Sequence, residues 1–166
     1  MPRHAIAKRE GFRHHERMGS FFDPVRFWQS KPALLWRARV ERERSAIGRF
    51  SDEVEQRLTT GRVPTQAVHD MLVAFDELLT NVVMHAEQAA GPVEIELSRR
   101  GKAVGATIRY LAVEFDPTTW SAGPAGTTVA TSRIGGLGIQ LVRRLMDEFH
   151  YEYVDGHNVV RIAKRC

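Results

Sequence analysis

The sequence predicts an α/β fold in which a mixed, mostly antiparallel sheet packs against helices on one of its faces. Three observations support this prediction. Apolar side chains recur at helical spacing over residues 65–89, residues 93–97 and 103–111 flank a short turn, and residues 151–154 and 159–163 flank another. Because strands joined by a tight hairpin run antiparallel, and helices separate the strand segments, we expect a two-layer sandwich.

The first half of the chain supplies one strand and two helices. Residues 33–40 alternate apolar and polar side chains in their second half, which indicates an edge or half-buried strand. Residues 45–58 carry apolar side chains at spacings of three and four, as one face of a helix requires. Gly61 and Pro64 then interrupt the chain before the long amphipathic helix of residues 65–89 begins.

The second half contains two turns and a long loop. Gly101 lies in the turn of the first hairpin, between residues 93–97 and 103–111. Asp155-Gly156 is the signal for a second hairpin near the end of the chain. Between them, residues 117–133 are rich in Thr, Ser, Gly and Ala, and loops of that length are usually functional or disordered. A helix is predicted over residues 135–146.

Charge divides the chain into two parts. Residues 1–50 hold twelve Lys and Arg against five Asp and Glu, whereas residues 51–166 hold twelve against fifteen. We therefore interpret residues 1–31 as a basic arm and residues 32–166 as one domain. Direct binding of nucleic acid is not expected, because the excess positive charge lies in the arm instead of a patch on the folded surface. The alternative is an arm that binds nucleic acid or an acidic partner by charge.

Composition also favours the cytoplasm. Cys166 is the only cysteine, so no disulfide can form within the chain. No apolar stretch approaches the ~20 residues that cross a bilayer, and the basic start lacks the apolar core of a secretory signal. We expect a cytoplasmic protein without a membrane partner.

Three polar residues follow one another at four-residue spacing on the long helix, namely Glu77, Asn81 and His85. Four residues advance a helix by about 400°, so the three side chains form one row beside the apolar stripe. A carboxylate can take a proton from a hydroxyl, and an amide oxygen can bind Mg²⁺ that bridges phosphate oxygens. Such residues on a helix are also commonly solvated, so the row alone leaves both interpretations open.

A glycine-rich segment, Gly135-Gly136-Leu137-Gly138, opens the next helix. Glycines allow close approach of the backbone to an anion, and the helix N-terminus adds a favourable partial charge. The segment has neither the lysine of a P-loop nor the preceding strand of a dinucleotide-binding motif, and glycine clusters also form plain turns. A phosphate loop and a simple turn therefore both remain open.

Together and in this order, the two motifs resemble those of a known superfamily. Residues 77–86 resemble the asparagine box, and residues 135–142 the second glycine box, of the ATPases that include gyrase, heat-shock chaperones and sensor histidine kinases. Phe115-Asp116-Pro117, residues 141–148 and residues 151–156 further resemble the anti-sigma factor serine kinases of bacterial partner switching. The resemblance covers about residues 33–164.

This resemblance implies a Bergerat-type ATPase fold with an ATP site between the long helix and the loop of residues 117–133, which would act as a lid. Mg²⁺ would bind Asn81, and Glu77 would act as the general base. The implied partners are a sigma factor, which is held inactive, and an anti-anti-sigma protein whose serine is phosphorylated; a homodimer is also compatible. The residues implied in nucleotide binding are Asn81, His85, Gly135, Gly136, Leu137, Gly138 and Ile139.

One segment departs from the family pattern. Aligned without gaps on Phe115, the family's Asp-x-Gly, whose aspartate accepts a hydrogen bond from the adenine amino group, falls on Tyr110-Leu111-Ala112. Loss of such a bond weakens binding ~10- to 100-fold. Glu114 could replace the aspartate only through a register shift, which we do not expect. Two hypotheses follow: an ATP-dependent serine kinase that sequesters a sigma factor, and a nucleotide-independent module that regulates by association.

Overall fold

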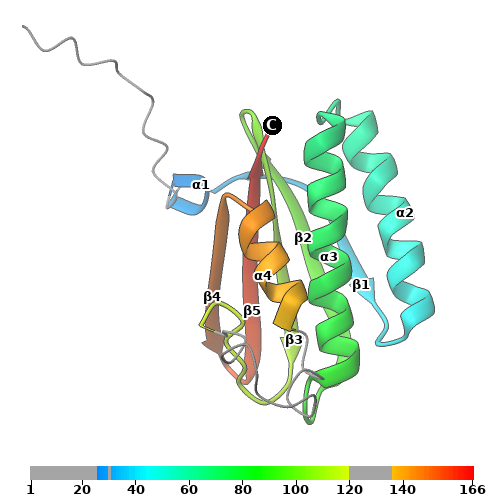
Figure 1. Ribbon diagram of the computed structural model, residues 1–166, viewed down its shortest axis with the longest axis vertical. Helices are drawn as coiled ribbons and strands as arrows, with labels where there is room; N and C mark the ends of the chain where they lie inside the picture. Colours follow the sequence, from blue (N-terminus) through cyan, green and yellow to red (C-terminus); the bar gives the residue numbers. More distant parts are fainter. Residues whose placement is uncertain (1–25, 30, 120–135) are drawn as a thin grey trace, which may run out of the picture.

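A five-stranded sheet carries helices across one of its faces (Figure 1). The computed structural model describes residues 26–29, 31–119 and 136–166. The predicted α/β sandwich is confirmed. Its elements are α1 (Arg26–Gln29), β1 (Ala33–Val40), α2 (Arg44–Thr60), α3 (Thr65–His85), β2 (Ala90–Arg100), β3 (Ala103–Leu111), α4 (Gly136–Leu145), β4 (Glu148–Val154) and β5 (His157–Arg165).

The strands follow the order β1-β2-β3-β5-β4, and each of these four pairings is antiparallel. Both predicted hairpins form at residues with left-handed backbone: Gly101 has φ 56°, and Asp155 and Gly156 have φ 50° and 77°. Two successive left-handed residues match the twist of the strands that they connect. Because β5 lies between β3 and β4, the start of β5 stands beside the end of β3.

The core fills the space between the sheet and α2, α3 and α4. The apolar stripe of α3 is buried, as its periodicity predicts. Trp36 of β1 stacks on Phe50 of α2 with ring centroids 5.7 Å apart, and Phe50 meets Phe75 of α3 edge-on at 5.1 Å. These aromatic contacts hold α2 and α3 against the β1 edge of the sheet. No helix among the described residues is long and apolar enough to span a membrane.

The long helix is shorter than its sequence pattern indicates. It ends at His85, whereas helical spacing of apolar residues extends to about Ala89. Ala86 already has extended backbone (ψ 111°), and Gln88 is left-handed (φ 49°). The alanines repeat at helical spacing but lie on the connection into β2, which begins at Ala90. The predicted boundary is therefore wrong by one helical turn.

Part of the predicted basic arm packs against the sheet. Phe27 of α1 is 3% exposed, and its ring occupies the space that a side chain at Gly105 of β3 would need. The amide nitrogen of Phe27 donates to Glu148 Oε1 at 3.1 Å, and Arg100 Nη1 donates to the Phe27 carbonyl at 3.1 Å. Gly105 is thus required for a close approach, and α1 covers the face of the sheet opposite α3.

A buried ion pair links α3 to β5. Asp70 Oδ2 lies 2.8 Å from Lys164 Nζ, and Gln66 Nε2 donates to Asp70 Oδ1 at 2.7 Å. The Asp70 side chain is 5% exposed. Burial by itself would raise the pKa of Asp70, but the hydrogen bonds from Lys164 and Gln66 outweigh it and hold that pKa below its ordinary value.

Lys164→Met should therefore destabilise the fold by about 2–3 kcal/mol at pH 7, because it leaves a buried carboxylate without its cation. Since the folded-state pKa of Asp70 is lowered, its stabilisation is present above the unfolded-state pKa of about 4 and is lost as the pH falls through the folded value. The difference in unfolding free energy between wild type and Lys164→Met, measured by urea unfolding, should shrink below pH 4. Lys102→Met, at an exposed turn, is the control; equal stability of the two variants would contradict the prediction.

Candidate functional site

The candidate site lies where the second half of α3 meets the start of α4. Burial of Leu78 and Val82 sets the rotation of α3 and leaves the row Glu77, Asn81 and His85 beside the core. Exposure increases along this row: Glu77 and Asn81 are half-buried, and His85 is exposed. The row thus leads from the contact with α4 to the surface at the end of the helix.

A cavity of about 470 Å³ opens beside this row. It includes Asn81 and His85 but not Glu77, which lies one turn deeper. The volume falls within the range of small-molecule sites, and such sites are mostly apolar with a few polar groups. Its wall is formed by Leu78, Asn81, Val82, Met84, His85, Ala86, Glu87, Ile108, Tyr110, Val113, Glu114, Phe115, Pro117, Ile139 and Val160.

The start of α4 packs directly on the polar row. A Cβ at Gly138 would overlap the carboxylate of Glu77, and would lie 2.7 Å from its Cδ. Only glycine therefore allows α4 to approach α3 with Glu77 in its present position. The contact brings a helix N-terminus, with its partial positive charge, next to a carboxylate and to the cavity.

The amide of Asn81 is the unsatisfied polar group of the site. Its Nδ2 is buried and has no hydrogen-bond partner among the described residues. A buried donor without a partner is unfavourable, so a ligand oxygen at this position would be stabilising. An Asn side chain can donate to a phosphate oxygen through Nδ2 and bind Mg²⁺ through Oδ1. This end of the cavity therefore fits a phosphate with Mg²⁺.

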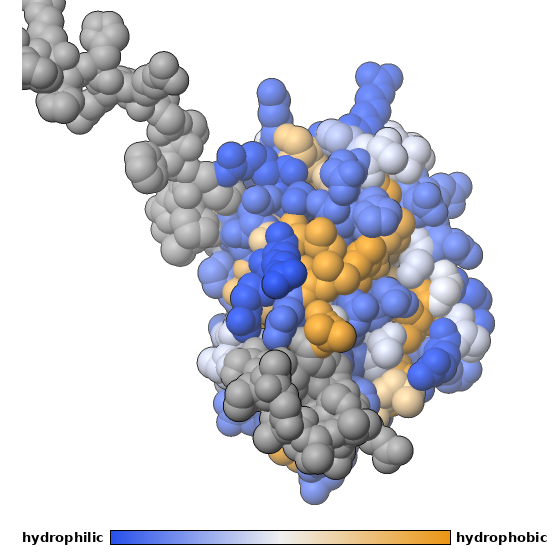
Figure 2. All heavy atoms as spheres, in the orientation of Figure 1, coloured by the Kyte–Doolittle hydropathy of each residue, from blue (hydrophilic) through white to orange (hydrophobic). Residues whose placement is uncertain are grey.

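The remaining residues of the predicted glycine box have different environments. Gly135 lies outside the described residues, and Gly136 begins α4. Ile139 is buried in the wall of the cavity. Leu137, by contrast, is 83% exposed and Leu141, one turn later, is also exposed. Figure 2 shows an apolar band across the middle of the face on which Figure 1 places α4.

The wall of the cavity also contains a neutral phenol. Tyr110 is 6% exposed and lies in the wall, where the family pattern has an aspartate. Burial, followed by the nearby Tyr151, raises the pKa of Tyr110 far above its ordinary value, so the hydroxyl keeps its proton. The pairing of Tyr110 with Asn158 and of Leu111 with His157 shows no slip. Glu114 follows the strand, in the wall of the cavity.

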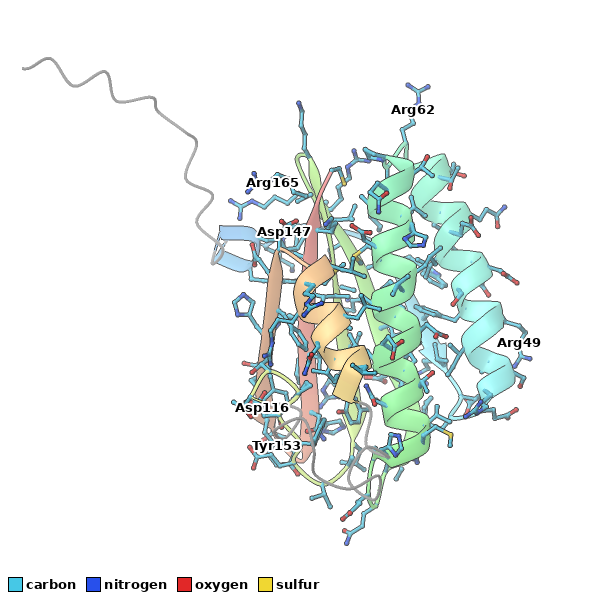
Figure 3. All side chains as sticks on the ribbon, in the orientation of Figure 1. Arg49, Arg62, Asp116, Asp147, Tyr153 and Arg165 are labelled. Carbon is cyan, nitrogen blue, oxygen red and sulfur yellow. The ribbon has the colours of Figure 1, made fainter. Side chains whose placement is uncertain are left out.

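The sequence motifs do not predict Asn158, Tyr151 or Tyr153 as site residues. The sequence pattern places Asn158 in the turn between residues 151–154 and 159–163, but Asn158 lies in β5 and is fully buried. Asn158 stands two residues before buried Val160, and residues at this spacing share one face of a strand. This spacing is the sequence feature that indicates its burial. Figure 3 places Tyr153 and Asp116 together at the end of the molecule where β3 ends.

With this fold and site, the chain belongs to the histidine kinase-like ATPase domain family, whose sequence profile matches residues 40–164. Among curated relatives, it is similar to the serine/threonine-protein kinase BtrW of Bordetella bronchiseptica, with 32% identity over 90 residues, 53% of this chain and 63% of that protein. It is also similar to the serine-protein kinase RsbW of Listeria innocua, with 31% identity over 101 residues, 57% of this chain and 64% of that protein.

A solved structure shows the same fold. The crystal structure of the RsbU and RsbW domains of Rv1364c from Mycobacterium tuberculosis aligns with a TM-score of 0.57 and 14% identity, over 82% of this chain and 32% of that one. The match to the curated kinases spans less than two thirds of their length.

Proposed function

We propose that this protein is a cytoplasmic anti-sigma regulatory factor that binds ATP with Mg²⁺ in the cavity beside α3. One observation carries the proposal: the buried amide nitrogen of Asn81, in the wall of a cavity next to the start of α4, has no hydrogen-bond partner in the part of the chain that the structure describes. A group of this kind requires a polar ligand, and a helix N-terminus favours an anionic one.

Each residue of the site then has a chemical role. Asn81 would hold Mg²⁺ and one phosphate oxygen, and the backbone of Gly136, Leu137 and Gly138 would contact the phosphates. Bound ATP supplies the phosphoryl group. Glu77, next to Gly138, would accept the proton of an incoming serine hydroxyl. His85 stands at the exposed end of the row and would contact the nucleotide from the rim.

The similarity to serine kinases supports a transcription-regulating partner switch as the biological role. The proposed partners are a sigma factor, bound and held inactive, and an anti-anti-sigma protein whose serine accepts the phosphoryl group. A homodimer is compatible with this role.

A titration with Mg-ATP tests the proposal directly. A ligand at ~100 times its Kd stabilises the fold by about 2.7 kcal/mol, which for a domain of this size raises Tm by roughly 5–10 °C. We expect this increase with Mg-ATP and a smaller one for Asn81→Leu, which removes both polar atoms of the amide. An unchanged Tm of the wild-type protein at millimolar Mg-ATP would contradict the proposal.

The alternative is a nucleotide-independent module that regulates a partner by association alone. Tyr110 favours it, because a buried neutral phenol stands where a carboxylate would receive the adenine amino group. The same titration separates the two functions: a regulator of this second kind shows no stabilisation by Mg-ATP, and its affinity for a partner does not change when ATP is added.

A further inference from the structure

Asn158 occupies a central position at the end of the sheet. It lies at the start of β5, opposite Tyr110 of β3 and opposite Tyr153 of β4. Its side chain is 0% exposed and shares the helix-facing side of the strand with buried Val160. A primary amide in such a place is unfavourable unless its oxygen and its nitrogen are both hydrogen-bonded.

Both polar atoms of the Asn158 amide are hydrogen-bonded. Oδ1 accepts hydrogen bonds from the Phe115 amide at 2.9 Å and from the Tyr151 hydroxyl at 2.8 Å. Nδ2 donates to the Val113 carbonyl at 3.1 Å and to the Ala112 carbonyl at 3.5 Å. Two donors around the oxygen and two carbonyls around the nitrogen define the orientation of the amide. Neither an acid nor an aliphatic residue could make all of these contacts.

The tyrosine of this network keeps its donor role over a wide pH range. Burial, with a contribution from Glu114, raises the pKa of Tyr151 to about 12. Its hydroxyl therefore stays protonated at neutral pH and continues to donate to Asn158. Tyr153 adds a separate bond, from its hydroxyl to the Ala112 carbonyl at 3.2 Å.

The bonded segment, residues 112–115, has left the sheet and forms part of the cavity wall. Val113, Glu114 and Phe115 all line the cavity. On its other side, the Val113 amide donates to the Glu87 carbonyl, just after α3, at 3.1 Å. The wall is thus held between the end of α3 and Asn158.

We infer that Asn158 is a positioning residue that places the wall of residues 112–115 against the base and sugar of the bound nucleotide. The inference rests on the proposed nucleotide site. The wall that Asn158 holds is bonded to Glu87, ten residues after Glu77, whereas the phosphates would bind at the contact between Gly138 and Glu77. Its loss should therefore affect recognition of the base and sugar, and not of the phosphates.

The test compares Mg-ATP with Mg-bound inorganic triphosphate, by calorimetry or by competition with a fluorescent nucleotide. Asn158→Asp keeps the shape and the oxygen but replaces the two N–H donors by a second acceptor, which faces two carbonyls. Its affinity for Mg-ATP should fall about tenfold or more, whereas its affinity for triphosphate should stay at the wild-type value. Tyr151→Phe removes one donor from the network and should give a smaller loss in the same direction.

Gln66→Glu is the matched control, because it is also an amide-to-acid change beside a hydrogen-bond partner, Asp70, but at the far end of α3. It should lower Tm without changing either affinity. Wild-type Mg-ATP affinity in Asn158→Asp, or equal losses for both ligands, would overturn the inference; if that variant does not fold, Tyr151→Phe decides in the same way. A wild-type protein that binds no Mg-ATP would reject the proposed function itself, and this inference with it.

Discussion

Replacing Gly138 with alanine is expected to slow Mg-ATP turnover ~100-fold or more, the scale on which a general base contributes. The added Cβ would overlap the carboxylate of Glu77. Because that carboxylate is the free end of a flexible side chain, it can rotate away without moving either helix. We therefore expect the free energy of unfolding to stay within about 1 kcal/mol of the wild-type value, although the Glu77 carboxylate moves away from its present position. Release of inorganic phosphate and urea unfolding measure the two effects.

Gly48→Ala provides the control for this change. Gly48 lies on the exposed side of α2, and a Cβ there would meet nothing within 4 Å. Alanine at this helical position should raise stability by about 0.5–1 kcal/mol and leave turnover unchanged. Full turnover in Gly138→Ala would show that Glu77 does not act from its present position.

Replacing Tyr110 with aspartate and Ala112 with glycine together is expected to raise Mg-ATP affinity ~10- to 100-fold, the range that a hydrogen bond to a buried carboxylate provides. Tyr110 stands in the wall of an open cavity, so the shorter side chain leaves space for the base. The same change removes a buried ring, and the ligand-free variant should lose about 3 kcal/mol of stability. The affinity measured by calorimetry should thus rise, while the Tm of the ligand-free variant measured by thermal unfolding should fall.

The neighbouring residue offers a charge-matched control. Leu111→Asp introduces the same carboxylate one position further along β3, at an exposed side chain outside the cavity wall. It should not raise the affinity for Mg-ATP. If the double variant binds no better than wild type, a defect other than the missing aspartate limits nucleotide binding in this chain.

The local elements of this protein are encoded in short-range patterns of its sequence. Helical periodicity identified α2 and α3, strand alternation and turn residues identified both hairpins, and four-residue spacing placed Glu77 and Asn81 on one side of a helix. These features depend on residues close together in the chain, so their periodicity is visible in the sequence. The fold class and the family followed from their order.

The contacts between residues far apart in the chain become visible in the three-dimensional fold. Insertion of β5 between β3 and β4 brings Asn158 next to Tyr110 and to the segment after β3. The pairing of Asp70 with Lys164 and the contact of Phe27 with Gly105 likewise join positions far apart in the chain. Such contacts leave no local period, because they depend on strand order and on side-chain packing across the layers.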